Sequence, residues 1–247
     1  MTTTSPKAFS ELGGWQSGPT IELPGEVHGT TVLALRCKDG ALVLADRRAT
    51  MGNLIMYERA EKVEMLDPHT VVAISGAYAR SLEICRYLAH AFKYYERLNL
   101  QAISAEGKLM EIIRALADNM PMAAQGIGVF LPIAAAYDPK NDSFGVYFFD
   151  TAGARFQDSD YACAGSGSER IRGIFEYLIR TKGPFGERKK AEVLEDGLRM
   201  LDIAATLDSA TGGFRKSLPL VCEVTREGAA FMSDDAIRKA AGPILAE

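Results

Sequence analysis

Apolar and polar positions along the chain follow two regular patterns. Short apolar runs between turn residues predict buried strands, whereas apolar residues that recur every three or four positions predict helices. The predicted strands cover residues 31–35, 41–45, 62–66, 70–74, 126–137, 144–149, 161–164, 218–224 and 229–232. The predicted helices cover residues 77–98, 104–119, 168–180 and 187–206, and Ser233 caps a short last one.

In this order the helices arrive in pairs between groups of strands. Single helices between strands would indicate a parallel doubly wound sheet, so the pairing argues against that fold. It suits two antiparallel sheets that stack face to face, with helices over both outer faces. We therefore expect an α+β chain with a polar extension over residues 1–29 and one domain over residues 30–247, where no repeat or further boundary is evident.

Composition narrows the class of protein. The chain has 247 residues, and no apolar run is long enough to cross a bilayer. The first residues lack the basic start and apolar centre of a signal peptide, so we expect a cytoplasmic protein. The net charge is −4 and the basic residues form no long stripe, so neither nucleic acid nor a membrane is an expected partner.

Short motifs of cysteine and basic residues have plain structural interpretations. The cysteines are far apart and form no Cys-x-x-Cys pair, which favours buried free thiols over a metal site or disulfides. They are Cys37, Cys85, Cys163 and Cys222. We interpret the run Arg188-Lys189-Lys190 as the solvated face of a helix.

The histidines offer little for catalysis. His28, His69 and His90 show no metal-ligand spacing and fit no Ser-His-Asp or Cys-His arrangement. We therefore expect neither a metal nor a cofactor. If the chain is an enzyme, its general base comes from another group.

The stretch Val27-His28-Gly29-Thr30-Thr31 provides such a base if the chain is cut between Gly29 and Thr30. Thr30 then gains a free α-amine, which can take the proton from its own hydroxyl through a water molecule. An α-amine has a pKa of about 8, closer to neutrality than that of a lysine side chain. Gly-Thr-Thr is common, however, and a flexible linker that enters a first strand is the alternative interpretation.

Other polar groups stand at the ends of the predicted elements. Asp46 follows one strand, Lys62 begins another, and Ser75-Gly76 precedes the first helix. Gly165-Ser166-Gly167-Ser168 precedes the third helix, and the run 208–213 follows the fourth. Each has an ordinary alternative, such as an ion pair of Asp46 with Arg48, a turn or a helix cap.

Taken together and in this order, these features resemble the β subunits of the 20S proteasome, most closely the bacterial, actinobacterial type. The resemblance covers residues 30–245. It implies a four-layer αββα sandwich of the N-terminal nucleophile hydrolase class over residues 30–247. It also implies that residues 1–29 are a propeptide, removed by self-cleavage between Gly29 and Thr30.

The resemblance also implies roles for single residues. Thr30 matches the catalytic threonine, Asp46 and Lys62 match its charged partners, and Gly76 matches the glycine whose N–H helps to form the oxyanion hole. The groups that bind and orient the amine match Ser166, Asp208 and Thr211. The family usually has serine where this chain has Thr211, which keeps the hydroxyl but leaves its geometry open.

Elementary chemistry supports these roles. An ammonium at Lys62 would lower the pKa of both the amine and the hydroxyl of Thr30. Asp46 would hold Lys62 charged, because an unpaired buried ammonium is costly. A backbone donor at Gly76 would stabilise the developing oxyanion by roughly 3 kcal/mol.

By the same resemblance, the substrate pocket is lined by Ala49, Thr50, Ala60, Glu64, Ile74 and Tyr78. Its small and apolar members favour an apolar residue before the cut bond. Glu64 and Tyr78 weaken that preference, since Glu64 can face a basic side chain and Tyr78 can narrow the space.

The expected function is that of a threonine endopeptidase subunit that degrades unfolded polypeptides inside a barrel. The resemblance implies seven-membered rings of this β-type chain, separate α subunits and a ring-shaped ATPase that feeds them. Three alternatives remain open. They are the peptidase subunit of the related bacterial two-ring ATP-dependent protease, a catalytically silent structural β-type subunit, and an amidohydrolase of the same nucleophile class.

Overall fold

The computed structural model describes residues 29–52, 54–158 and 160–245, so the predicted extension lies outside the described residues except for Gly29. The strands are β1 (Val32–Cys37), β2 (Gly40–Ala45), β3 (Ala49–Met51), β4 (Leu54–Tyr57), β5 (Val63–Asp67), β6 (Thr70–Ala73), β7 (Ile133–Asp138), β8 (Ser143–Phe149), β9 (Arg155–Asp158), β10 (Tyr161–Ala164), β11 (Leu220–Val224) and β12 (Ala229–Phe231). The helices are α1 (Tyr78–Asn99), α2 (Ala105–Ala123), α3 (Ser168–Lys182), the 3₁₀ turn η2 (Phe185–Glu187), α4 (Lys190–Leu207) and α5 (Asp234–Leu245).

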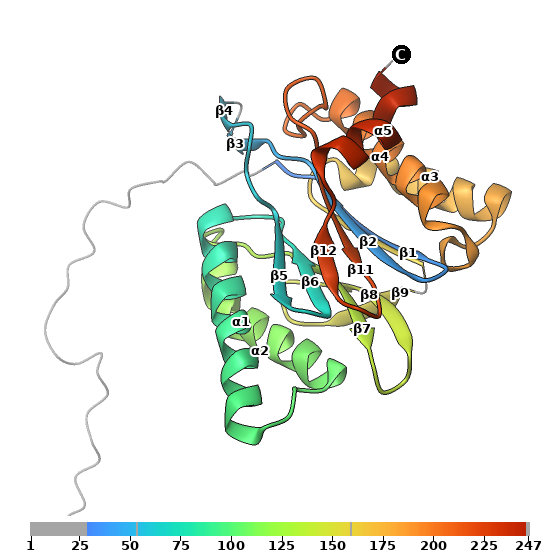
Figure 1. Cartoon of the computed structure of the whole chain (residues 1–247). Coiled ribbons are helices and arrows are strands. Elements are labelled where there is room, and N and C mark those ends of the chain that lie inside the picture. The colour runs from blue at the N-terminus through green and yellow to red at the C-terminus, as the bar shows by residue number, and fades with distance from the viewer. Residues whose placement is uncertain (1–28, 53, 159, 246–247) are drawn as a thin grey trace, which may run out of the picture.

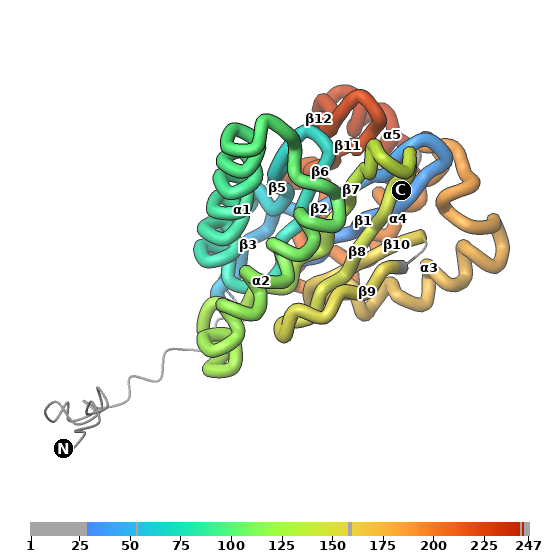
Figure 2. The backbone as a smooth tube through the Cα atoms, turned by 90° about the horizontal axis from the view of Figure 1, so that it is seen from below, coloured from blue at the N-terminus to red at the C-terminus, as the bar shows by residue number. Residues whose placement is uncertain are grey.

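Two antiparallel five-stranded sheets form the centre of the molecule. One has the strand order β10-β1-β2-β11-β12 and the other the order β5-β6-β7-β8-β9. Figures 1 and 2 show α1 and α2 on the outer side of the second sheet, and α3, α4 and α5 on the outer side of the first. The expected four-layer αββα arrangement is therefore confirmed.

Strand β1 shows how the sequence builds these layers. Side chains alternate across a strand, so Leu33 and Leu35 pack against the helices while Val32 and Ala34 face the other sheet. The layer between the sheets is rich in alanine and valine, and the layers beneath the helices contain the larger leucine, isoleucine and phenylalanine side chains. Both faces of β1 are buried, which explains its continuous apolar run.

Two predicted boundaries were wrong for local reasons. The strand predicted over residues 126–137 begins only at Ile133, because Gly126 and Gly128 adopt positive φ angles of 75° and 64°. The helix predicted over residues 104–119 extends to Ala123 and contains Pro121. Ser104 caps its N-terminus, since the hydroxyl of Ser104 accepts a hydrogen bond from the backbone N–H of Gly107.

The sequence did not predict the hairpin of β3 and β4, which projects from the body of the molecule (Figure 1). It also did not predict β9. The run that precedes α4 was interpreted wrongly at one residue. Arg188 is buried, pairs with Asp196 and stacks on the ring of Phe185, so it is an internal contact and not part of a solvated face.

The thiol prediction is confirmed, because all four cysteines are free and buried. None of the helices within the described ranges combines the length and apolar content that a membrane span requires.

Candidate active site

Thr30 stands two residues before β1, next to Thr31. Its side chain is buried, and its Oγ1 donates a hydrogen bond to the carbonyl oxygen of Gly29 at 2.7 Å. Its backbone nitrogen donates to the Oγ of Ser166 at 3.4 Å. The hydroxyl thus lies against the carbonyl group of the very bond that the sequence predicts to be cut.

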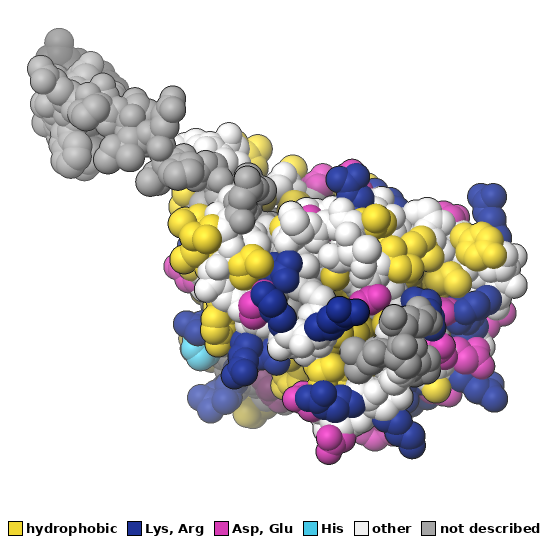
Figure 3. All heavy atoms as spheres, turned by 90° about the horizontal axis from the view of Figure 1, so that it is seen from above, with side chains coloured by type: hydrophobic (Ala, Val, Ile, Leu, Met, Phe, Trp, Pro, Cys, Tyr) yellow, Lys and Arg dark blue, Asp and Glu magenta, His cyan; other side chains and the backbone are white. Residues whose placement is uncertain are grey.

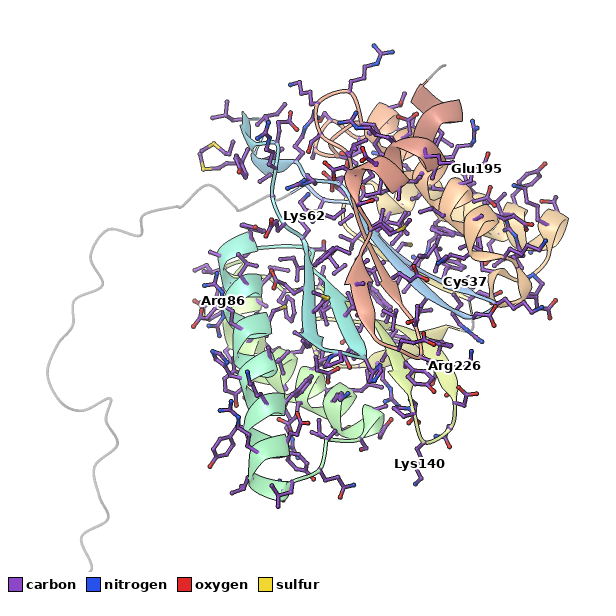
Figure 4. All side chains as sticks on the ribbon, in the orientation of Figure 1. Cys37, Lys62, Arg86, Lys140, Glu195 and Arg226 are labelled. Carbon is purple, nitrogen blue, oxygen red and sulfur yellow. The ribbon has the colours of Figure 1, made fainter. Side chains whose placement is uncertain are left out.

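Asp46 and Lys62 are in contact, although they lie next to strands of different sheets. Asp46 follows β2 and Lys62 precedes β5, and the Nζ of Lys62 lies 2.8 Å from Oδ1 of Asp46. The side chain of Lys62 is only 3% exposed and that of Asp46 is 0% exposed. Figure 4 labels Lys62 near the beginning of α1. This pair joins one sheet to the other beside Thr30.

Asp46 is further satisfied by backbone donors. Its Oδ1 accepts from the N–H of Thr31 at 2.8 Å, and its Oδ2 accepts from the N–H groups of Arg48 and Gly212 at 2.9 and 2.8 Å. These bonds fix the orientation of the carboxyl group beside Lys62. Asp46 is therefore suited to hold Lys62 in place as a charged partner.

Burial lowers the pKa of Lys62, and the negative charge of Asp46 opposes that effect. Lys62 and Thr30 line the same small hollow, together with Gly29 and Gly76. A lysine with a lowered pKa beside a hydroxyl can stabilise an alkoxide and take part in proton transfer.

The second polar group of the site is a chain of hydroxyls around Asp208. Ser166 and Thr211 both donate to Oδ2 of Asp208 at 2.6 Å. The hydroxyl of Thr31 lies 2.7 Å from that of Thr211, and it is the donor because the Thr211 proton goes to Asp208. Burial raises the pKa of Asp208, but the bonds from Ser166 and Thr211 prevail and hold it below its ordinary value. Asp208 thus fixes the Ser166 oxygen that faces the Thr30 nitrogen.

Gly76 takes a backbone conformation that only glycine fits easily, with φ at 103°. It forms an antiparallel bridge with Phe130, flanked by bonds from Ala77 N to Val129 O at 2.7 Å and from Leu131 N to Ser75 O at 2.9 Å. In such a bridge the central residue directs its own N–H away from the partner strand. The N–H of Gly76 therefore faces away from Phe130, and Gly76 borders the hollow that holds Thr30.

The predicted substrate pocket is brought together in part. Ala49, Ile74 and Tyr78 line the hollow beside Thr30. The hydroxyl of Thr50 instead accepts from the backbone N–H of Gly29 at 3.1 Å. Ala60 is buried, and its N–H donates to the carbonyl of Arg47.

Glu64 lies outside the set of residues that line the hollow. It is half-buried on β5, where burial and the charge of Glu61 raise its pKa, with Arg86 opposing. The hydroxyl of Tyr78 accepts from the N–H of Glu61 at 3.1 Å, which fixes the ring at the border of the hollow.

Four contacts of the site were not predicted from the sequence. A Cβ on Gly165 would lie 1.9 Å from the carbonyl oxygen of Thr30, and one on Gly29 would lie 1.7 Å from the Cβ of Ala210. Arg48 donates to the carbonyl of Ser209 at 2.7 Å and pairs with Glu58. Glycine at positions 29 and 165 was the sequence signal of these two close approaches.

The donor set of the site consists of hydroxyl groups, one ammonium and two carboxylates. In the part of the chain that the structure describes, no group of three or more His, Cys, Asp and Glu side chains is placed to hold a metal ion.

Comparison with known proteins gives one family. A family model described as "Proteasome subunit" matches residues 26–214. "Proteasome subunit beta" of Acidothermus cellulolyticus is 35% identical over 236 residues, which cover 92% of this chain and 79% of the relative. The proteins of the same name from Streptosporangium roseum and Frankia alni are 33% and 29% identical, over 85% and 100% of this chain and 73% and 88% of the relatives. The chain therefore belongs to the proteasome subunit family.

Proposed function

We propose that the chain is a threonine endopeptidase subunit of a 20S proteasome core and that it matures by cutting its own Gly29–Thr30 bond. The observation that carries the proposal is the hydrogen bond from Thr30 Oγ1 to the carbonyl oxygen of Gly29 at 2.7 Å. It places the nucleophile beside the bond to be cut, in a site that also contains the buried Lys62–Asp46 pair.

Self-cleavage begins with attack of Thr30 Oγ1 on the carbonyl carbon of Gly29. The new C–O bond gives a tetrahedral oxyanion, the C–N bond then breaks, and the hydroxyl proton ends on the released nitrogen of Thr30. Water hydrolyses the resulting ester and frees a chain that begins at Thr30. Until the C–N bond breaks, the nitrogen is an amide and cannot act as a base, so the uncut chain is inactive toward substrates.

In the mature chain, the freed amine of Thr30 acts as general base for its own hydroxyl. Ser166, held by Asp208, orients that amine, and the ammonium of Lys62 favours the alkoxide. The N–H of Gly76 donates a hydrogen bond to the oxyanion of the tetrahedral intermediate, a contribution of roughly 3 kcal/mol. The hollow lined by Ala49, Ile74 and Tyr78 holds the side chain before the cut bond.

The chain works, in this proposal, in the cytoplasm as seven-membered rings of its own kind that stack on α subunits, with unfolded polypeptides delivered by a ring-shaped ATPase. Membership in the proteasome subunit family supports assembly with other subunits. The β3–β4 hairpin supports it as well, because a lone chain leaves five large apolar side chains uncovered there. They are Met51, Leu54, Ile55, Met56 and Tyr57. Figure 3, which views this end of the molecule, shows groups of exposed hydrophobic side chains.

Replacement of Thr30 tests the proposal. The full chain is co-expressed with an α-type subunit, and intact mass and hydrolysis of a fluorogenic peptide are measured. We expect the wild-type chain to lose residues 1–29 and hydrolyse the peptide. Thr30→Ala should do neither, and Thr30→Ser should retain both because it keeps a hydroxyl.

Hydrolysis by Thr30→Ala would refute the proposal. A wild-type chain that a threonine-directed covalent inhibitor fails to label would favour a silent structural subunit. Failure to co-purify with α subunits, with activity intact, would favour the two-ring protease. Cleavage of small amides by the isolated chain, without peptide hydrolysis, would favour an amidohydrolase.

A further inference from the structure

The backbone that presents Gly76 is fixed on its outer side by a buried side chain that does not belong to the site. Gly76 is held against residues 129–131 by the flanking bonds of its bridge with Phe130. A Cβ on Gly76 would lie 2.2 Å from the carbonyl oxygen of Val129, so the two backbones are in direct contact. A shift of residues 129–131 would therefore move the N–H of Gly76.

Asn119 holds the residue that precedes this contact. It lies on α2, is only 2% exposed, and its Nδ2 donates to the carbonyl oxygen of Gly128 at 2.8 Å. Its Oδ1 accepts from the Nε of Arg80 at 2.8 Å. A buried amide with both ends bonded resists displacement, because a shift would leave polar groups unpaired away from water.

Arg80 connects Asn119 back to the segment that contains Gly76. It lies in the first turn of α1, four residues after Gly76, so its position is coupled to that of the glycine through the helix. Gly128 adopts a φ of 64°, and a Cβ there would lie 3.2 Å from the Cγ of Arg80. The chain thus links Gly76 to Arg80, and Arg80 contacts both Asn119 and Gly128. Val129, which follows Gly128, accepts a hydrogen bond from Ala77 beside Gly76.

We propose that Asn119 is a positioning residue for the oxyanion-binding N–H of Gly76. It acts through the carbonyl of Gly128 and not by touching the substrate. The inference rests on the proposed function, in which the N–H of Gly76 donates a hydrogen bond to the oxyanion of the intermediate. Alignment of such a donor matters because small misplacements near a reacting centre are costly for the rate.

The sharpest variant is Asn119→Asp. It has the same shape and keeps an acceptor for Arg80, but it presents an oxygen in place of the donor to the carbonyl of Gly128. In the processed chain co-expressed with α subunits, we expect kcat to fall by about tenfold or more while KM changes less than about twofold. Affinity for a peptide aldehyde, whose adduct with Thr30 carries an oxygen in the oxyanion position, should fall by a similar factor. Affinity for an uncleavable peptide of the same sequence should not change.

Asn119→Ala serves as the second variant, with the same expected pattern, and thermal melting shows whether either variant folds less well. Glu83→Gln is the control, because it removes the exposed partner of Arg80 without touching Asn119, and we expect wild-type kinetics. The inference is overturned if both Asn119 variants keep wild-type kcat, or if the aldehyde and the uncleavable peptide lose affinity equally. A wild-type chain without peptidase activity would instead overturn the proposed function.

Discussion

The Nζ of Lys62 lies 2.8 Å from Oδ1 of Asp46, but the two partners depend on each other unequally. Asp46 also accepts hydrogen bonds from the N–H groups of Thr31, Arg48 and Gly212. Among the described residues, Asp46 is the only hydrogen-bond acceptor of Lys62. Loss of the carboxylate therefore strands a buried ammonium, whereas loss of the ammonium leaves a carboxylate that still has three donors.

This asymmetry predicts an order of stability. Asp46→Asn should lower the free energy of unfolding by about 3–5 kcal/mol, the usual cost of breaking a buried pair. Lys62→Met should cost about 1–3 kcal/mol, because the remaining carboxylate stays hydrogen-bonded. Urea unfolding of the uncut chain measures both, and peptide hydrolysis should be lost in both. Equal costs, or a larger cost for Lys62→Met, would contradict this account.

Glycine is predicted to be the only residue type that fits at position 29 without a shift of the backbone. A Cβ at this position would lie 1.7 Å from the Cβ of Ala210, so Gly29→Ala must move the carbonyl group away from the Thr30 hydroxyl. We expect self-cleavage to slow by about tenfold or more. The measurement is the intact mass of the chain as a function of time. The double variant with Ala210→Gly should recover part of the rate. If the double variant recovers none of the rate, the clash with Ala210 is not the cause of the slow self-cleavage.

Thr50 is predicted to matter more for self-cleavage than for later turnover. Its hydroxyl accepts from the N–H of Gly29 and so holds the residue before the cut bond. Thr50→Val keeps the shape but removes the acceptor, and we expect processing to slow by several-fold, about the effect of one hydrogen bond. Thr50→Ser is the matched control and should process normally. A Thr50→Val chain expressed so that it already begins at Thr30 should retain most of its peptidase activity, and an equal loss there would argue against a role in processing.

The pKa of Asp208 predicts how stability responds to acid. Although burial raises this pKa, the hydrogen bonds from Ser166 and Thr211 hold it below its ordinary value of 3.8. A carboxyl group whose pKa is lowered in the folded state adds stability above its ordinary pKa, and this stability is lost as pH falls through the lowered value. Asp208→Asn should therefore be less stable at neutral pH and lose less stability below about pH 4. Urea midpoints of both proteins between neutral and acid pH measure this, and parallel curves would show that Asp208 does not contribute.

The layers of the fold could be predicted because their central strands, such as β1, β2 and β6, are buried on both faces. The continuous apolar run of β1 and the pairing of helices between groups of strands were enough to indicate two stacked sheets. The position of Asp46 after a buried strand drew attention to it, but the resemblance to proteasome β subunits, and not the spacing, indicated Lys62 as its partner. A charge next to a buried strand needs a partner, and each of these two provides one for the other.

The remainder depended on tertiary contacts that leave no local pattern. The residues of β4 are apolar but exposed, so their hydrophobicity indicated no face of the fold. Arg188 lies in a basic run yet is buried, because Asp196 from the second turn of α4 pairs with it. Asn119 is one polar residue near the end of a helix, and only the loop that returns to it shows what it bonds.

The seam of small side chains between the sheets has a consequence for chemistry. Thr30 precedes a strand of one sheet and Lys62 precedes a strand of the other, so in the proposed mechanism the thickness of that layer sets the distance between nucleophile and lysine. Fully buried alanines and valines between the sheets, such as Ala34 and Val71, then set this distance. We expect a change of one methylene group in this layer to alter the rate without any contact with the site.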